Sequence, residues 1–410
     1  MGRGLNRRVA ITGMGIVTAH GIGKAVNWER TIAGESGIRP ITLFDTAGYR
    51  TKTAGQLADL PAAPWRRIRP SRVDRASSLL YHALTEALEE SGLSRTPWQS
   101  PPIVALGTTL GGMASGQRYH ETYVRKGPSL ARPSHLADHL AHCQSLHLME
   151  EFSIPGAPRV FSNACASGAN AVGYGFRAIR AGQADVTFCG GYDPLCEFVF
   201  AGFHSLQALT FELCRPFDRN RSGLAIGEGA GILVLERWEQ AQARGARILG
   251  EIIGYGESND GFHMTRPDPG GKVAALAVRR ALEDAGLEPE AVDYVNAHGT
   301  GTPFNDASET AALIAALGSR ATQIPVSSTK SMIGHLLGGA GAVEGILTVL
   351  ALKENWLPPN VNYETPDPDC GLWIVRKAER ASRMTVALSN SFGFGGANAT
   401  LAFRAVGGDA

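Results

Sequence analysis

The chain has 410 residues, a formal net charge of +1, 44% hydrophobic residues and 19% charged residues. These values exclude a disordered chain, and a charge near zero gives no overall field to attract nucleic acid or a membrane surface. The length is too great for one ordinary hydrophobic core, so we expect two domain-sized units or one duplicated unit.

Six cysteines stand at positions 143, 165, 189, 196, 214 and 370. No two of them form a C-x-x-C pair, and the basic start of the chain is not followed by the apolar segment of a signal peptide. We therefore expect reduced thiols and a cytoplasmic protein. The most apolar segment, Leu336 to Leu352, is short for a membrane span and carries Glu344 near its centre. It predicts a buried core helix with one paired or functional carboxylate, not a membrane span.

Strands that end in glycine turns alternate with helices in the first part of the chain. The segment from Arg8 to Gly23 opens with an apolar strand, but Thr18 replaces the third glycine of the dinucleotide-binding pattern G-x-G-x-x-G. The polar segment from His120 to His147 lacks the paired spacing of zinc ligands, so we expect a surface helix and loop with solvated histidines. The other elements expected here are helices at 27–34 and, after a basic run, 65–92, and strands at 103–112, 185–191, 232–236 and 248–256.

The stretch from Val160 to Gly173, VFSNACASGANAVG, holds the strongest candidate for a nucleophile. Its pattern predicts a strand, a tight turn and a helix that begins at Cys165 and runs to about Ala181. Small neighbours leave the sulfur uncovered and let the backbone approach a substrate carbonyl. Free N–H groups and the positive end of the helix dipole favour a thiolate over a thiol. The alternative is an inert cysteine buried in a seam of small residues.

The second part of the chain repeats the same alternation of elements. Helices are expected at 273–286 and 306–318, and strands at 292–299, 324–328 and 385–396. This rhythm predicts an α/β fold with buried central strands and helices on both faces. Each half places reactive residues where a strand ends, which is where ligand sites of such sheets gather. We therefore divide the chain into an N-terminal half, 1–254, that carries the nucleophile and a C-terminal half, 255–410, that carries two histidines.

Three further glycine-flanked motifs are expected at strand ends. NAHGTGTPFND contains His298, STKSMIGHLLGGAGAVE contains Lys330, His335 and Glu344, and SNSFGFGGAN, residues 389–398, offers many backbone N–H groups. Taken alone, each histidine is better explained as a packed structural residue. Together with a cysteine they match acyl transfer, in which a thiolate attacks an acyl carbonyl, imidazoles assist and backbone N–H groups stabilise the oxyanion.

These four motifs resemble those of the β-ketoacyl-acyl-carrier-protein synthases, the condensing enzymes of fatty-acid and type II polyketide synthesis. The resemblance covers nearly the whole chain, from VAITGMG through GEGAG, residues 227–231, to SFGFGGAN. It implies a dimeric protein with a duplicated thiolase fold, αβαβα twice, with layered mixed sheets and buried central helices. It also implies an acyltransferase that performs decarboxylative Claisen condensation of an acyl thioester with malonyl-acyl-carrier protein to give a β-ketoacyl-acyl-carrier protein.

The resemblance assigns roles to the residues of the four motifs. Cys165 would carry the acyl chain as a thioester, and His298 and His335 would assist decarboxylation and hold the enolate and thioester oxygens. The N–H groups of Cys165 and Phe394 would form the oxyanion hole, and Phe394 would also gate the acyl pocket. Lys330 and Glu344 would hold His335 and the local charge in place.

Other residues are assigned to binding. Thr300 and Thr302 would bind the phosphopantetheine arm of the carrier protein, and no tightly bound cofactor is expected. Thr109, Leu110, Phe203 and Phe392 are assigned to the acyl pocket, with plain core packing as the alternative. Asn296, Glu344, Ser389 and Asn390 match a site where some members bind a monovalent cation. The basic residues that would dock an acidic carrier protein, or simply face water, are Arg67, Arg69, Arg72, Arg125, Lys126 and Arg132.

Two other interpretations stay open at this point. A thiolase-type acyltransferase shares the fold, but its second cysteine would stand in the C-terminal glycine loop, which here reads SNSFG. A subunit can also act only with an inactive partner of the chain-length-factor type, so both a homodimer and a heterodimer remain possible. The aromatic segment YDPLCEFVFA, residues 192–201, and TPFND, residues 302–306, leave open whether the pathway is fatty-acid, polyketide or polyene synthesis.

Overall fold

A computed structural model of the protein describes residues 7–93, 98 and 100–407. The strands of the first half are β1 Val9–Thr18, β2 Gly21–Ile22, β5 Ile103–Gly107, β6 Arg159–Phe161, β7 Val186–Asp193 and β8 Gly229–Arg237. Those of the second half are β9 Gly250–Asn259, β10 Tyr294–Asn296, β11 Pro325–Ser327, β13 Trp373–Ile374, β15 Val386–Phe392 and β16 Ala397–Arg404. Two short ribbons pair β3 Arg39–Pro40 with β4 Thr53–Ala54, and β12 Trp356–Leu357 with β14 Glu379–Arg380.

The strand order repeats between the two halves of the chain. The main sheet follows the order β13-β11-β10-β15-β16-β9-β1-β8-β7-β5-β6, with β2 beside β1. The first half contributes β6-β5-β7-β8-β1 and the second β11-β10-β15-β16-β9, and in each set the first two pairings are parallel and the last two antiparallel. This is the duplicated arrangement expected from the sequence. The predicted boundary between residues 254 and 255 falls within β9 and stays a prediction of where the repeats meet.

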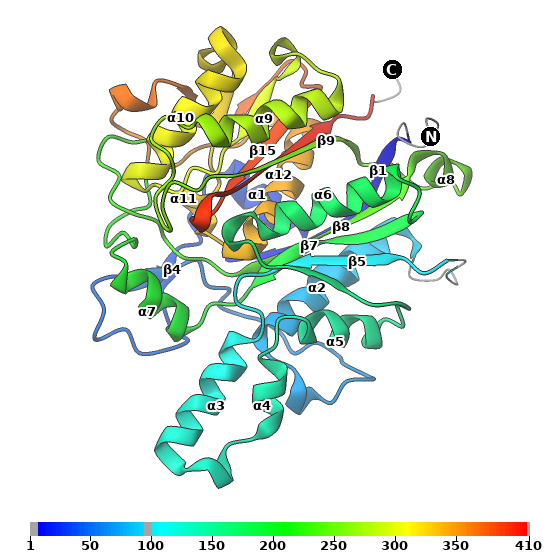
Figure 1. Ribbon diagram of the computed structural model, residues 1–410, viewed down its shortest axis with the longest axis vertical. Coiled ribbons are helices and arrows are strands. Elements are labelled where there is room, and N and C mark those ends of the chain that lie inside the picture. Colours follow the sequence, from blue (N-terminus) through cyan, green and yellow to red (C-terminus); the bar gives the residue numbers. More distant parts are fainter. Residues whose placement is uncertain (1–6, 94–97, 99, 408–410) are drawn as a thin grey trace.

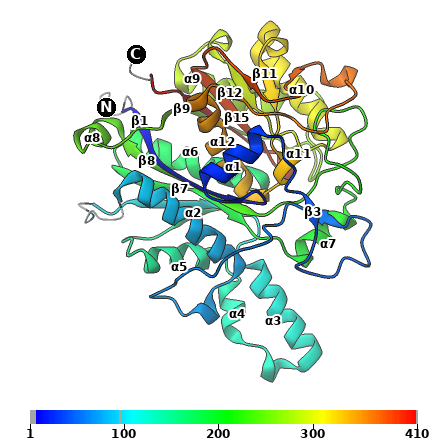
Figure 2. The ribbon, with the colours of Figure 1, turned by 180° about the vertical axis from the view of Figure 1, so that it is seen from behind.

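The helices form the outer layers and the central layer. Their bounds are α1 Lys24–Ile32, α2 Arg75–Ser91, α3 Met113–Lys126, α4 Pro133–Asp138, α5 Cys143–Glu151, α6 Ser167–Arg180, α7 Glu197–Ser205, α8 Trp238–Ala243, α9 Lys272–Ala285, α10 Pro303–Leu317, α11 Lys330–Ile333 and α12 Ala340–Glu354. On the outside, α2 packs on β1 and β8, and α9 packs on β9 and β16. Between them, α6 and α12 contact each other and strands of both halves (Figures 1 and 2).

The central position of α12 explains its composition. Every residue from Ala340 to Leu352 is buried, so this helix is apolar on all sides, as a helix inside a protein core is. Its one carboxylate, Glu344, forms an ion pair with Lys330. The prediction of a core helix with a paired carboxylate is confirmed. Within the described ranges, no helix combines the length and the apolar character that crossing a membrane requires.

Two local predictions are corrected by the structure. The histidines of 120–147 were expected to face water, but His147 is buried, with Nδ1 3.2 Å from the hydroxyl of Ser77 and Nε2 3.6 Å from Asp138. It lies on the face of α5 that packs against α2. In addition, α10 begins at Pro303 and not at 306, because the hydroxyl of Thr302 accepts the N–H of Asn305 and proline fits the first turn of a helix.

Candidate active site

Cys165 lies where β6 leads into α6. It sits in a single 3₁₀ turn, Ala164–Ala166, so it precedes the first residue of α6 and does not open the helix as predicted. The surrounding chain must be small for this turn to fit. A Cβ added at Gly393 would stand 3.0 Å from the backbone nitrogen of Cys165, which is tighter than nearly all real Cβ contacts. The glycine loop of the second half therefore packs directly against the nucleophile of the first half.

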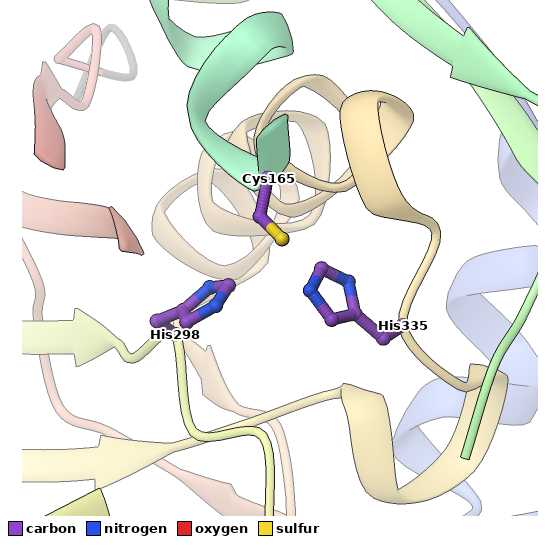
Figure 3. Close-up of side chains that lie close together, drawn as sticks. All are labelled: Cys165, His298 and His335. Atoms are coloured by element: carbon purple, nitrogen blue, oxygen red, sulfur yellow. The ribbon is translucent and has the colours of Figure 1, made fainter. Parts of the chain in front are cut away.

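His298 and His335 face the cysteine from two sides (Figure 3). His298 follows the end of β10, and His335 follows α11. The Sγ of Cys165 and one ring nitrogen of each histidine all lie within 4.8 Å of one another. The ring centroids of the histidines are 5.1 Å apart, with their planes at 80°. The three side chains that the sequence singled out thus converge at one point.

Burial sets the protonation of both imidazoles. It holds the pKa values of His298 and His335 well below their usual range, and the positive charge of Lys330 lowers both further. Both rings are therefore neutral at physiological pH. For His335 the tautomer also follows from geometry: Nδ1 accepts the N–H of Leu337 at 3.1 Å, so the proton is on Nε2. This Nε2 has no hydrogen-bond partner within the described protein, so it is free to donate to a substrate oxygen.

The expected preference for a thiolate is wrong for the free enzyme. Burial raises the pKa of the Cys165 thiol to about 11, although Lys330 and the backbone N–H of Phe394 act in the opposite direction. Cys165 as a residue is only 6% exposed, and the loss of water around its sulfur outweighs the effect of the nearby helix terminus. Cys165 is therefore a thiol at rest, and it must lose its proton before the sulfur can act as a nucleophile.

One ion pair and one further carboxylate hold the segments that carry the histidines. The ammonium group of Lys330 in α11 contacts the carboxylate of Glu344 in α12, and both side chains are almost fully buried. Glu309 in α10 was not predicted. Its carboxylate accepts the backbone N–H groups of His298 at 2.8 Å and Gly299 at 2.7 Å. Glu309 thereby fixes the turn that carries His298. The only sign of this role in the sequence is that Glu309 is an acidic residue in the helix that follows NAHGTG.

A cavity of about 260 Å³ reaches the sulfur. Of the residues assigned to binding, Thr300, Thr302, Phe203 and Phe392 line it, together with the gate candidate Phe394. The rings of Phe203 and Phe394 are stacked, with centroids 5.8 Å apart and planes at 23°. Cys165, His298 and His335 all line this cavity, so it can bring an acyl substrate to the thiol and both imidazoles.

The other two acyl-pocket candidates do not line this cavity. Thr109 is exposed and donates its hydroxyl to the carbonyl oxygen of Ala164 at 3.2 Å. Leu110 is buried in an apolar cluster with Leu195 and Phe200. Thr109 therefore lies beside the turn that carries Cys165, whereas Leu110 packs in the apolar core.

The basic residues proposed for carrier docking are at the surface. Arg67, Arg69, Arg125, Lys126 and Arg132 are exposed, and Arg72 lies 3.6 Å from the buried carboxylate of Asp138. Arg125 and Lys126 end α3, which extends away from the body of the molecule with α4 (Figure 1).

The residues matched to a cation site offer oxygen atoms. Asn296 Oδ1, Glu344 Oε2 and Ser389 Oγ are buried and have no hydrogen-bond partner within the described protein. Buried oxygen atoms without donors suit a hard cation. Asn390 fits less well, because its Oδ1 accepts the hydroxyl of Thr400 at 2.9 Å.

Comparisons with known proteins agree with this geometry. Residues 6–241 match the family described as "Beta-ketoacyl synthase, N-terminal domain", and residues 249–364 match "Beta-ketoacyl synthase, C-terminal domain". A 3-oxoacyl-[acyl-carrier-protein] synthase 2 of Synechocystis sp. is 41% identical over 407 residues, which cover 97% of this chain and 98% of the relative.

Solved structures of similar shape point the same way. The ishigamide ketosynthase/chain length factor superposes with a TM-score of 0.93 at 37% identity, over 98% of this chain and 100% of that one. A ketosynthase bound to the hexaketide, in a complex with its type II PKS acyl-carrier protein, gives a TM-score of 0.88 at 30% identity, over the same shares of the two chains.

Proposed function

This chain belongs to the β-ketoacyl synthase family, and on that premise we propose that it condenses an acyl thioester with malonyl-acyl-carrier protein, releasing CO₂ and giving a β-ketoacyl-acyl-carrier protein. It is then an acyltransferase of the condensing-enzyme class, in fatty-acid or type II polyketide or polyene elongation. The observation that carries the proposal is the convergence of Cys165, His298 and His335 at the end of one cavity.

The first step is transfer of the acyl chain to the cysteine. The Sγ of Cys165 attacks the thioester carbonyl, the carrier sulfur leaves as a thiolate, and the proton of the cysteine passes to that thiolate. The developing oxyanion would be stabilised by the N–H groups of Cys165 and Phe394, because preorganised N–H donors in a water-poor site act on charge that develops in the transition state. The Phe394 N–H already interacts with the sulfur and favours its ionised form.

The second step makes and uses the carbon nucleophile. The malonyl carboxylate leaves as CO₂, and the electrons of the broken C–C bond form an enolate. His298 and the Nε2–H of His335 would hold the enolate oxygen, and because both rings are neutral they supply no readily transferred proton. The enolate carbon attacks the acyl carbonyl, the thiolate of Cys165 leaves, and it takes up a proton from water.

The carrier delivers both substrates on its phosphopantetheine arm. Thr300 and Thr302 line the cavity with hydroxyl groups 2.9 Å apart, which supports the proposal that they would bind the amide groups of that arm. The arm enters as part of the substrate, and no tightly bound cofactor is needed for this chemistry. We place the protein in the cytoplasm, where its six free cysteines stay reduced.

The protein would act as a dimer with itself or with a subunit of the chain-length-factor type. In support, β6 ends the main sheet, so its outer edge can pair with a strand of a second subunit. A monovalent cation would be held by Asn296, Ser389 and the Oε2 atom of Glu344, with Asn390 beside them, while the other carboxylate oxygen of Glu344 stays paired with Lys330.

One experiment tests the proposal directly. The purified protein, alone and with candidate partner subunits, is incubated with acyl carriers of several lengths and malonyl carrier, and the products are read by intact mass spectrometry. We expect acyl adducts on Cys165 and carrier products longer by two carbons that keep the keto group. Acyl exchange between thiols without loss of CO₂ would instead support a thiolase-type transferase.

A further inference from the structure

Asp193, which the proposed mechanism does not use, binds both catalytic segments. It is the last residue of β7, and its side chain is fully buried. Its carboxylate accepts the hydroxyl of Thr108 at 2.5 Å and the backbone N–H groups of Thr109 at 2.9 Å, Leu110 at 2.9 Å and Gly338 at 2.6 Å. A single carboxylate therefore joins one loop of the first half to one turn of the second.

Each side of this junction leads to a catalytic group. On one side, Thr109 donates its hydroxyl to the carbonyl oxygen of Ala164, the residue before Cys165. On the other side, Leu337 precedes Gly338 and donates its N–H to Nδ1 of His335. A short series of hydrogen bonds through Asp193 thus connects the turn before Cys165 to the imidazole of His335.

The two segments are in close contact, and Leu110 and Leu337 share one apolar cluster. A Cβ added at Gly338 would stand 2.5 Å from the backbone nitrogen of Thr109, so the chains meet backbone to backbone. Three N–H groups point inward at this place, and without the carboxylate they would be buried without an acceptor. Charged acceptors make stronger bonds to N–H groups than neutral ones.

We propose that Asp193 is a positioning residue that holds His335 at its working distance from Cys165 by joining the segments Thr108–Leu110 and Leu337–Gly339. The inference rests on the proposed condensation. It predicts that loss of the carboxylate impairs the step that needs both groups, malonyl decarboxylation with condensation, more than acylation of Cys165, which the turn and the N–H of Phe394 still support.

The ionisation of this carboxyl group gives a second readout. Burial raises the pKa of Asp193 to about 6, although its four hydrogen bonds lower it. The titratable groups that face it are Tyr192, Cys165 and Cys196, and burial keeps all three neutral by raising their pKa values. Below about pH 6 the carboxyl is protonated and loses one acceptor site, so the turnover number should fall with decreasing pH through that value.

The test compares Asp193→Asn with the wild type and with Asp218→Asn. Asp218 is a matched control, because it is equally buried and its Oδ2 accepts the backbone N–H groups of Glu364 and Thr365 at 2.7 and 2.6 Å, away from the cavity. We measure acylation of the cysteine by mass spectrometry, malonyl decarboxylation as CO₂ release, and the thermal midpoint. In Asp193→Asn, decarboxylation should fall about 100-fold, as expected when catalytic groups are displaced by about 1 Å, while acylation and the KM for malonyl carrier change little.

A milder variant covers the case in which Asp193→Asn does not fold. Thr108→Val removes one donor and keeps the carboxylate, so we expect a smaller loss in the same step. In Asp193→Asn the fall of turnover near pH 6 should also disappear. Equal losses of acylation and decarboxylation, or the same step-specific loss in Asp218→Asn, would overturn the inference. A wild type that never condenses would instead count against the proposed function, so the two failures are distinguishable.

Discussion

Lys330 and Glu344 form an ion pair inside the protein, with side chains 1% and 2% exposed. The pair joins α11, which leads to His335, to the central helix α12. Its charge also reaches the catalytic groups, because Lys330 lowers the pKa values of both histidines and of Cys165. One buried cation thus adds to the effect of burial, which keeps the imidazoles neutral, and eases ionisation of the thiol.

Removing one member of this pair should cost more than removing both. Lys330→Met leaves the carboxylate of Glu344 buried without its partner, so the free energy of unfolding should fall by about 3–5 kcal/mol. The double variant Lys330→Met, Glu344→Gln should recover part of that loss. Urea unfolding of the two single variants and the double variant measures the coupling. If the losses simply add, the pair does not contribute to stability as a unit.

Alkylation of Cys165 should depend steeply on pH. Only the thiolate form of a cysteine reacts with an alkylating agent. Because burial raises the pKa of Cys165 to about 11, the unreactive thiol dominates below that pH. The rate with iodoacetamide should rise about tenfold for each pH unit from 7 to 9.5, as the thiolate fraction does when pH lies well below the pKa. Cys165→Ser provides the background from other cysteines. A rate that levels off below pH 9 would show that a thiolate already exists in the resting enzyme.

Each catalytic histidine should be needed for decarboxylation more than for acylation. His298→Ala and His335→Ala remove a neutral donor to the enolate oxygen, and loss of one such donor typically lowers turnover by about 100- to 1000-fold. Release of CO₂ from malonyl carrier measures this step, and the mass of the acyl-enzyme measures the other. His147→Ala is a suitable comparison, since that buried histidine lies outside the cavity. A decarboxylation rate unchanged in both site variants would remove the basis for the two-donor mechanism.

Charge reversal at the surface arginines should change the KM for carrier-bound substrates and not the KM for small acyl thioesters. Arg69→Glu should raise the KM for acyl carriers and leave small acyl thioesters unaffected, because only the carrier has an acidic surface to repel. Arg72→Glu should do the same and also lower stability, since Arg72 pairs with buried Asp138. Arg247→Glu, at an exposed site after α8, is the matched control. Equal effects on both kinds of substrate would speak against docking at these arginines.

The sequence was sufficient for the residues whose types and neighbours carry the chemistry. Cys165, His298 and His335 each stand in a glycine-flanked motif. The repeated alternation of strands and helices indicated a duplicated fold. The sequence did not indicate Asp193 and Glu309, because both act by accepting backbone N–H groups from other segments of the chain. An acidic residue in a sequence does not tell which amides it will accept.

Protonation was the other quantity that the sequence could not supply. The position of Cys165 near a helix start argued for a thiolate, but the local helix effect is smaller than the loss of solvent around a buried sulfur, and that loss depends on the whole fold. The same holds for His147. Its polar neighbours indicated a surface segment, while the packing of α5 on α2 places it inside.

The pairing of β1 with β9 makes the two repeats parts of one continuous sheet. Rigid-body rotation of one half against the other would break main-chain hydrogen bonds between β1 and β9. We therefore expect that the site does not open and close by movement of the two halves. Instead, we expect an acyl chain to enter and leave through rotation of single side chains, such as the stacked rings of Phe203 and Phe394. Substitutions at Phe203 or Phe394 should therefore change which acyl chains enter the cavity without moving Cys165, His298 or His335.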